Sequence, residues 1–301
     1  MLEDSVITGF ADEIAPALDL QVELLHKLGI SMIELRGANG KGFVDHSLQE
    51  ARAVWDYLRE HDMGVSVLAS PIGKIDIRED TGGHMELLRY AAELAHLVET
   101  PYIRVFSFYI PQDQDAEIYR EEVLERVGRM KELAEQSDVI LLHENEKGIY
   151  GDNAARCLEL MEHFYGEHFK AVFDFANFVQ CHQDTLEAYD MLSPYIAHVH
   201  IKDALFKDGS VTPAGMGDGH IREILTGLEA AGYKGYLSLE PHLTDFAGFA
   251  GLEAGVRQLL DKGEAAADPE NAAAREDKRR LRGDEAFTLA YKALIDLLEQ
   301  L

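Results

Sequence analysis

The chain repeats one pattern eight times: a short run of β-branched, aliphatic or aromatic residues, then a stretch in which apolar residues recur at helical spacing. In the first such stretch, Leu18, Val22, Leu25 and Leu28 would lie on one face of a helix. Strands that are separated by helices pair in parallel rather than as hairpins. The eight expected strands cover residues 5–10, 31–36, 64–70, 102–108, 139–144, 171–175, 197–202 and 235–240.

Eight βα units predict an α/β fold of the closed (β/α)8 type, the TIM barrel. A doubly wound open sheet is the alternative, but the first expected strand is followed by neither GxGxxG nor a P-loop, the nucleotide-binding loops of such sheets. The glycine-rich GMGDG at 215–219 follows the seventh strand and lacks the lysine and hydroxyl of a P-loop. We interpret it as a flexible βα loop, with phosphate binding as the alternative.

A single domain is expected to span residues 1–301, interrupted once. The segment at about 261–284 is charged, rich in alanine and almost without large apolar residues, which indicates an insertion. Beyond it, a last helix is expected to close the barrel wall with an apolar face made of Phe287, Ala290, Leu294, Leu297 and Leu298.

Composition and charge restrict the classes of partner. The 301 residues are 47% apolar, enough for a large core, and 28 Lys and Arg against 55 Asp and Glu give a formal net charge of -27. Such a charge repels nucleic acid and anionic lipid. Cys157 and Cys181 are too few for a disulfide framework, and no apolar run of about 18 residues or signal peptide is evident. We expect a cytoplasmic protein, monomeric or homo-oligomeric, that acts on a small molecule.

Each of the last four expected strands carries, at or near its end, a side chain that can bind a divalent cation. These are Glu144, Asp174, His200 and Glu240, separated by 30, 26 and 40 residues, the length of one βα unit or slightly more. In a parallel barrel the carboxyl ends of all strands meet at one face, where active sites lie. Three carboxylates and one imidazole form a mainly oxygen site suited to Mn²⁺, Mg²⁺, Co²⁺ or Zn²⁺. The pattern predicts a metal site.

Other histidines lie close to these four positions. Of His198 and His200 on one strand, we expect His200 to reach the metal, with His198 facing the helices or lying one layer below; exchanged roles are the alternative. His143 should point away from the metal because it precedes Glu144. His242 either reaches substrate or caps a loop.

The motifs around these residues carry a family resemblance. HENEKGIYGD contains Glu144, FDFANF contains Asp174, HVHIKD contains His200, and SLEPH contains Glu240. In this order they resemble the xylose isomerase-like TIM-barrel superfamily, and within it the sugar phosphate isomerase/epimerase group. The likeness begins at FADEI (10–14), includes SPIGK (70–74) and fails only in the 261–284 segment.

The resemblance implies one divalent metal, Mn²⁺ first and Mg²⁺, Co²⁺ or Zn²⁺ as alternatives, held by Glu144, Asp174, His200 and Glu240. It also implies that Glu144 and Glu240 act as the acid and base. The chemistry is consistent, because removing a proton next to a ketone requires an enediolate to be stabilised, and a Lewis acid can do this. Proton return on the opposite face gives an epimer, and return to the neighbouring carbon gives an isomer.

Further polar residues near the expected strand ends are candidates for contact with a carbohydrate substrate. Lys202 either binds a sugar oxygen or pairs with Asp203 or Glu240, and Arg36 either binds substrate or pairs with Glu34 or Asp12. Lys74 is either a substrate contact or a solvated loop residue. The full set of substrate-binding candidates is Arg36, Lys74, Asn177, Lys202 and His242.

The expected activity is that of a metal-dependent isomerase or epimerase of a keto-sugar or related polyol derivative. Ketose 3-epimerases commonly have a histidine and an arginine where this chain has Asn177 and Phe206, so a free ketohexose is disfavoured. A larger keto-sugar, a keto-glycoside or an inosose fits at least as well. An inosose-type dehydratase is the main alternative, and we rank an endonuclease IV-like hydrolase and a non-catalytic sugar-binding barrel below it.

Overall fold

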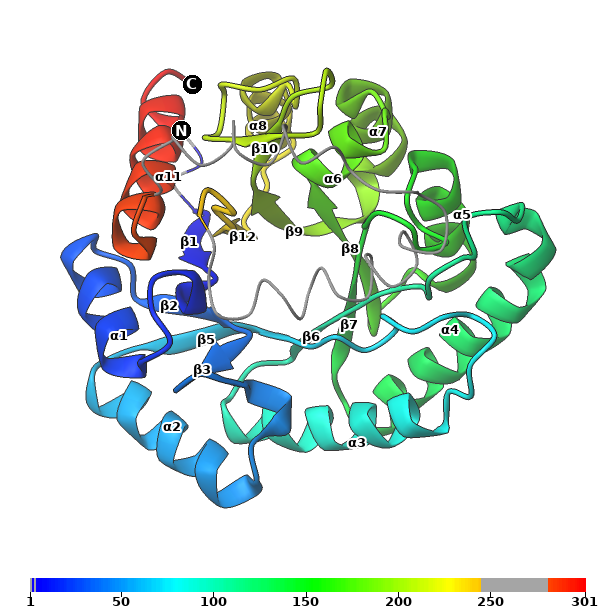
Figure 1. Ribbon diagram of the computed structural model, residues 1–301, viewed down its shortest axis with the longest axis horizontal. Coiled ribbons are helices and arrows are strands. Elements are labelled where there is room, and N and C mark those ends of the chain that lie inside the picture. The colour runs from blue at the N-terminus through cyan, green and yellow to red at the C-terminus, as the bar shows by residue number, and fades with distance from the viewer. Residues whose placement is uncertain (1, 3, 245–280) are drawn as a thin grey trace, which may run out of the picture.

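The fold is a nearly closed barrel of eight parallel strands, seen along its axis in Figure 1 of this computed structural model, which describes residues 2, 4–244 and 281–301. The strands follow the order β1-β12-β9-β8-β7-β6-β5-β2, and β1 lies beside β2 to complete the ring. The single (β/α)8 barrel predicted from the sequence is confirmed. The strands are β1 (Val6–Gly9), β2 (Met32–Leu35), β5 (Gly64–Ala69), β6 (Tyr102–Val105), β7 (Ile140–Glu144), β8 (Phe169–Asp174), β9 (Ile196–Ile201) and β12 (Tyr236–Leu239).

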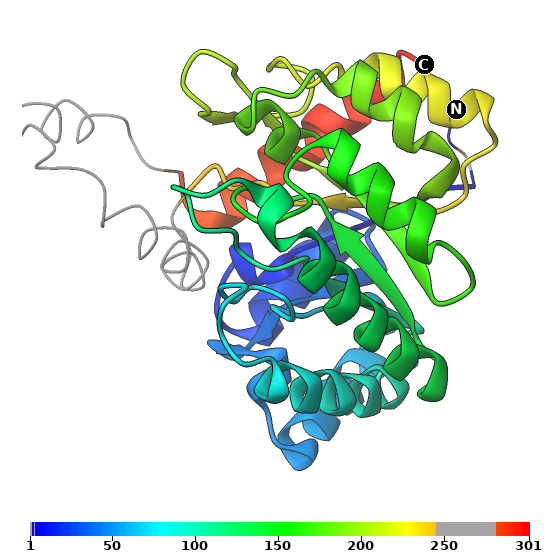
Figure 2. The same cartoon turned by 90° about the vertical axis from the view of Figure 1, so that its right-hand side faces the viewer.

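Helices surround the strands on the outside of the ring (Figures 1 and 2). They are α1 (Leu18–Lys27), α2 (Leu48–Glu60), α3 (Gly82–Leu97), α4 (Arg120–Gln136), α5 (Ala154–Phe164), α6 (Phe175–Gln180), α7 (Thr185–Leu192), α8 (Ile221–Ala230) and α11 (Gly283–Leu298). Short 3₁₀ turns are η1 (Ala11–Glu13), η2 (Phe43–Asp45), η3 (Ala116–Tyr119) and η4 (Ser193–Tyr195). Two small hairpins lie above the carboxyl ends of the strands: β3 (Gly37–Ala38) with β4 (Lys41–Gly42), and β10 (Asp203–Ala204) with β11 (Val211–Thr212). None of the described helices is long and apolar enough to cross a membrane.

Local sequence signals mark the start of several helices, α2, α5, α6 and α7 among them. At α2, Ser47 accepts a hydrogen bond from the backbone of Glu50, while the Glu50 carboxylate accepts one from the backbone of Ser47, a reciprocal capping box. Val54 and Leu58 of this helix then fall on one buried face. In this βα unit the sequence therefore specifies both the helix start and the face that packs on the barrel.

The last helix closes the barrel as predicted. Phe287 and Leu294 of α11 are fully buried, and the ring of Phe287 packs so closely on Gly9 of β1 that a methyl group there would lie 2.8 Å from it. The helix begins at Gly283, slightly before the expected end of the 261–284 insertion. The rest of that predicted insertion, 261–280, lies outside the described residues.

Two irregularities in the ladder lie next to the centre of the barrel. The register shifts between Ile33 and Glu34 in β2 and between Ala171 and Val172 in β8. Such bulges redirect the side chains that follow them and are frequent beside active sites. Here they precede Glu34 and the end of β8, so both segments deliver buried acidic groups to the interior.

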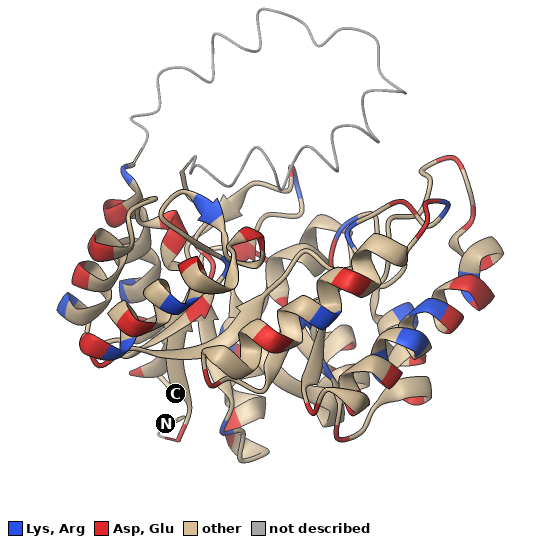
Figure 3. Cartoon of the chain, turned by 90° about the horizontal axis from the view of Figure 1, so that it is seen from below, with Lys and Arg blue, Asp and Glu red and all other residues tan. Residues whose placement is uncertain are grey.

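Apolar side chains fill the barrel below these acidic groups. Val67, Leu142 and Val172 form a buried cluster inside the ring, separate from the main core between strands and helices. The interior of the barrel is thus a packed core rather than a pore, and active sites of such barrels lie at the carboxyl ends of the strands. On the outer helices, acidic and basic positions are interspersed (Figure 3).

The GMGDG segment is not the flexible loop that the sequence suggested. Backbone N–H groups of Gly215, Gly217 and Gly219 all donate to the carboxylate of Asp203, at 3.0, 2.9 and 2.9 Å. A methyl group at Gly217 would lie 2.4 Å from that carboxylate. The three amides are therefore occupied by a side chain of the protein, which also argues against the alternative of phosphate binding.

Candidate metal centre

The four strand-end residues come together. Glu144 is the last residue of β7, Asp174 the last of β8, His200 the penultimate residue of β9, and Glu240 directly follows β12. One ligand atom from each lies within 4.8 Å of the others, and all four residues are buried. Neighbouring parallel strands therefore converge as the βα spacing predicted.

His200 lies at the middle of this group. Its Nδ1 is 3.1 Å from Oε1 of Glu144, 3.6 Å from Oδ2 of Asp174 and 3.6 Å from Oε2 of Glu240. Its other nitrogen, Nε2, lies 3.3 Å from Oε1 of Glu34. One side of the ring thus faces three carboxylates, and the other is held by a fourth.

His198 lies one layer below His200, the second of the two positions considered for it. Residues two apart on a strand share a face, so both rings point into the barrel, 5.2 Å apart between centroids. Nε2 of His198 lies 2.7 Å from Oε2 of Glu34, and Glu34 therefore joins the two histidines. His143 points elsewhere, as expected: its Nε2 lies 3.0 Å from Oγ of Ser107.

Asp174 divides its two oxygens between two roles. Oδ1 accepts a hydrogen bond from the backbone N–H of Asn177 at 2.8 Å and so caps α6. Oδ2 is buried and accepts no hydrogen bond from the described residues, although Nζ of Lys202 lies 3.1 Å away. Oε2 of Glu144 is likewise buried without a hydrogen bond from the described part of the chain.

Cationic side chains surround the carboxylates. Lys202 Nζ lies 2.7 Å from Oε2 of Glu240, whose Oε1 is 3.4 Å from Arg36 and 3.3 Å from Nε2 of His242. The alternative of a Lys202 pair with Glu240 is thus confirmed, and that with Asp203 is wrong because the glycine amides hold Asp203. Arg36 pairs with Asp12 at 2.9 Å and with Glu13 at 3.1 Å, not with Glu34.

These charges set the protonation states of the group. Burial alone would raise the pKa of Glu240, but Lys202, His242, His200 and Arg36 together hold that pKa well below its usual value. Burial would lower the pKa of His200, but the facing Glu144 and Glu34 carboxylates raise it well above the usual value. Glu144 and Glu240 are therefore ionised at neutral pH, and a proton on His200 balances part of their charge. A metal ion bound at Nδ1 of His200 would take the place of that proton.

The residues fit a divalent cation. Three carboxyl groups and one imidazole nitrogen converge, and two of the carboxyl oxygens carry no hydrogen bond from the described residues. The contact of Nε2 with Glu34 leaves Nδ1 of His200 as the ligand nitrogen and orients the ring, as outer carboxylates do for metal-binding histidines.

Two more of the substrate candidates lie at the mouth of the barrel. Nδ2 of Asn177 donates to Glu144 at 3.3 Å and to the carbonyl oxygen of Asn145 at 2.9 Å. Nζ of Lys74 lies 2.9 Å from Glu146 and 4.2 Å from the ring centre of Phe106, so it is not simply a solvated lysine. Lys202, Arg36 and His242 touch the candidate ligands directly.

Sequence reasoning missed Arg104 and Glu13. Arg104 is buried in the middle of β6 and its Nη1 lies 3.2 Å from Oε2 of Glu144. Glu13, also buried, receives the backbone N–H of His242 at 2.8 Å. A charged residue inside an otherwise apolar strand, as in TPYIRVFSF, is a signal that could have identified Arg104, since an arginine is rarely buried unless it is paired.

Comparisons with known proteins agree with this architecture. The model of the family of xylose isomerase-like TIM barrels matches residues 22–282. The 3-dehydroshikimate dehydratase of Bacillus anthracis is 21% identical over 182 residues, which cover 60% of this chain and 65% of that enzyme, slightly less than two thirds of its length.

Many solved structures share the fold, the following two among them. The IolI protein with a bound zinc atom has a TM-score of 0.68 at 17% identity, over 98% of both chains. The 3-keto-D-glucoside 4-epimerase YcjR from E. coli has a TM-score of 0.61 at 15% identity, over 85% of this chain and 99% of its own. Fold, strand-end residues and family match together show that this chain belongs to the xylose isomerase-like TIM-barrel family.

Proposed function

We propose that the protein is a divalent-metal-dependent isomerase or epimerase that acts on a keto-sugar or a related polyol derivative. The observation that carries the proposal is the buried convergence of Glu144, Asp174, His200 and Glu240 within 4.8 Å. The proteins similar to this chain include a 3-keto-D-glucoside 4-epimerase and a 3-dehydroshikimate dehydratase. The cytoplasmic location and a homo-oligomeric state stay predictions.

The ion would be held by those four residues. Mn²⁺ is our first choice, with Mg²⁺, Co²⁺ and Zn²⁺ as alternatives, because carboxylate oxygens dominate the ligand set and one imidazole joins them. When bound, the ion supplies Lewis-acid polarisation of the substrate oxygens. The IolI structure contains zinc in the same fold, which supports a metal in this family.

Glu144 and Glu240 would move the proton. Glu144 ends β7, and Glu240 directly follows β12. Because β8 and β9 separate these two strands in the ring, the two glutamates can approach a bound sugar from two sides. Burial opposes ionisation of Glu144, but His200 and Arg104 lower its pKa, and the pKa of Glu240 is lowered further. Both groups are therefore ionised at neutral pH. One of them can take the proton from the substrate carbon, while the other must first gain a proton from solvent or from a substrate hydroxyl, which it returns on the opposite side to invert the carbon.

The remaining polar groups would hold the substrate. Lys202 and His242 both lie against Glu240, and Asn177 lies against Glu144, so each can donate to a sugar oxygen placed between the two glutamates. Arg36 and Lys74 are further substrate-binding candidates at the edge of the same mouth. For all five residues, the substrate-binding role suggested by the sequence stays a proposal.

The test is exchange of substrate protons with solvent. Protein loaded with Mn²⁺ is incubated with candidate ketoses in D₂O, and NMR follows deuterium at the carbon next to the ketone. Glu144→Gln and Glu240→Gln should each lower exchange by at least about a hundredfold, since a positioned acid or base contributes about 10²–10⁴. Glu86→Gln, an exposed position on α3, is the matched control. Wild-type exchange in either variant would remove that glutamate from the mechanism.

A dehydratase is the second candidate, favoured by the similarity to 3-dehydroshikimate dehydratase. The same proton abstraction can be followed by loss of a β-hydroxyl as water, with Glu240 or Glu144 protonating the leaving oxygen. Mass spectrometry separates the two outcomes. A product lighter by one water identifies a lyase, whereas deuterium in a product of unchanged composition identifies an isomerase or epimerase.

A further inference from the structure

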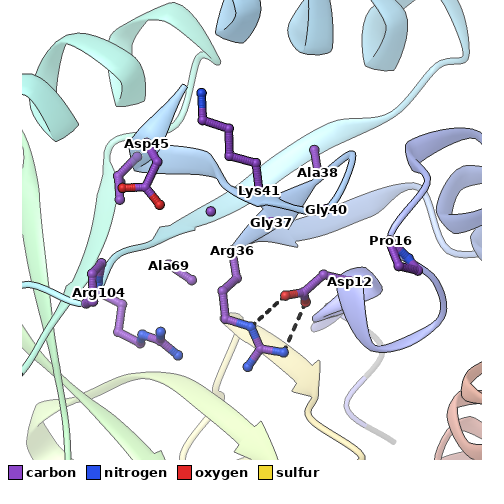
Figure 4. A pocket seen from close by; sticks show the side chains of 13 residues that line it. Asp12, Pro16, Arg36, Gly37, Ala38, Gly40, Lys41, Asp45, Ala69 and Arg104 are labelled. Atoms are coloured by element: carbon purple, nitrogen blue, oxygen red, sulfur yellow. Dashed lines mark hydrogen bonds and ion pairs between the residues drawn. The ribbon is translucent and has the colours of Figure 1, made fainter. Parts of the chain in front are cut away.

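A cavity of about 370 Å³ opens beside the candidate metal centre. It lies between the β3–β4 hairpin and the carboxyl ends of β5 and β6. Arg36 and Arg104 extend toward the same end of it, away from Lys41 (Figure 4). Those two arginines also touch Glu240 and Glu144, at 3.4 and 3.2 Å. The inner end of the cavity therefore adjoins the place where a sugar ring would react.

The walls of the cavity are made largely of small residues. Gly37, Ala38 and Gly42 contribute the hairpin side, and Ala69 contributes the β5 side. Exposed backbone and methyl groups form smooth surfaces that suit a flat or weakly polar group. The volume falls at the lower end of the range for small-molecule pockets, roughly 300–1,000 Å³, so it can take a group additional to the atoms held at the metal centre.

Charge balance excludes an acidic group as the preferred occupant. The three cations of the lining are each paired already: Arg36 with Asp12, Arg104 with Glu144, and Lys41 with a glutamate of α2 at 3.1 Å. A carboxylate or phosphate entering here would compete with these existing anions for the same cations. An uncharged group meets no such cost.

Arg104 is held in place at the inner end of the cavity. Its guanidinium carbon lies 5.2 and 5.0 Å from the ring centroids of Phe10 and Phe106, and its Nη1 lies 3.2 Å from Oε2 of Glu144. The side chain is therefore a fixed part of the cavity wall and not a free cation that would attract an anionic group.

We propose that this cavity is the subsite for an uncharged second group, an aglycone or a second sugar ring, attached to the keto-sugar that reacts at the metal centre. Arg36 and Arg104 bound the inner end of this subsite, and Ala69, the register partner of Arg104 on β5, keeps the space beside Arg104 open. The inference rests on the proposed function and narrows its substrate class to keto-glycosides.

Two ketones test it: free 3-keto-D-glucose and phenyl 3-keto-β-D-glucopyranoside, each incubated in D₂O with the Mn²⁺-loaded full chain. The phenyl glycoside should exchange with a kcat/KM at least about tenfold higher, because binding energy from the remote group is used at the reacting carbon. Equal values within about threefold, with exchange of both ketones, would overturn the inference and leave the proposed function standing. Exchange of neither would overturn both.

Substitution locates the effect in the cavity. Ala69→Leu should bring the preference for the phenyl glycoside down to about threefold or less, because the added methyl groups occupy its space. Ala69→Ser, which adds one oxygen atom, should keep it. A preference that survives in Ala69→Leu would overturn the assignment of the cavity. If Ala69→Leu fails to fold, Lys41→Trp, which adds bulk at the exposed rim of the cavity, replaces it. The ratio of kcat/KM for the phenyl glycoside to that for the free sugar should again fall, and an unchanged ratio would overturn the assignment.

Discussion

Nε2 of His200 and Oε1 of Glu34 lie 3.3 Å apart, which ties the only imidazole of the proposed ligand set to a buried carboxylate 166 residues away in the chain. The other oxygen of Glu34 contacts His198 at 2.7 Å, so both oxygens are used. Glu34 therefore fixes the tautomer and the orientation of the ring that would bind the metal.

Replacing Glu34 should weaken metal binding without removing a ligand. In Glu34→Gln the amide can accept from only one of the two histidines, and we expect Mn²⁺ affinity to fall by about 10–100-fold. Isothermal titration of the full chain measures this. Glu86→Gln removes the same charge at an exposed site and serves as the control. Affinity unchanged in Glu34→Gln would show that Glu34 does not support His200.

The contact of α11 with β1 should dominate the stability of the barrel closure. Phe287→Ala removes a fully buried ring packed on Gly9 and should lower the free energy of unfolding by about 3–5 kcal/mol. Leu289→Ala, on the same helix but 38% exposed, should lower it by less than about 1 kcal/mol. Urea unfolding followed by circular dichroism compares them. Equal losses in the two variants would contradict the packing of α11 on the barrel.

The loop that carries Lys74 should respond to pH through His84. Nδ1 of His84 accepts a hydrogen bond from the backbone N–H of Gly73 at 3.0 Å, and a protonated ring could not accept it. Gly73 has φ +91° and a methyl group there would lie 2.1 Å from the carbonyl oxygen of Phe106, so the loop cannot readily rearrange. Burial lowers the pKa of His84 below its usual value.

The sign of that effect follows from linkage. The unfolded chain, with a histidine pKa of about 6.5, binds the proton more tightly than the folded protein does. The contribution of His84 to stability is therefore complete above that pH and is lost as the pH falls from there through the lower pKa of the folded protein. His84→Asn keeps an acceptor that does not titrate and should flatten the decline of stability between pH 7 and 5. An identical pH profile in the wild type and His84→Asn would contradict the prediction. His26→Asn, at an exposed position of α1, controls for the substitution.

Much of the fold could be predicted from the chain. The eight strands lie within a few residues of their expected bounds, because alternating strand and helix periodicities are local properties of the sequence. The four strand-end residues could be chosen for the same reason: in a parallel barrel, a polar residue that ends an apolar strand has only one face to which it can point.

The errors concern partners rather than elements. GMGDG reads as a flexible loop, yet it is held by Asp203, and Arg104 escaped notice inside an apolar strand. Both depend on which side chain of a different βα unit, or of a distant loop, lies within about 3 Å. Periodicity carries no such information.

The amino-acid sequence by itself determined the barrel, the order of its strands and the four residues that end them, since each follows from patterns only a few residues long. Only the tertiary structure decided that Glu34 joins two histidines, that Arg104 lies against Glu144, and that a cavity opens beside them. Those contacts arise when strands far apart in the chain close into a ring, where distance and burial select the partner of each charge.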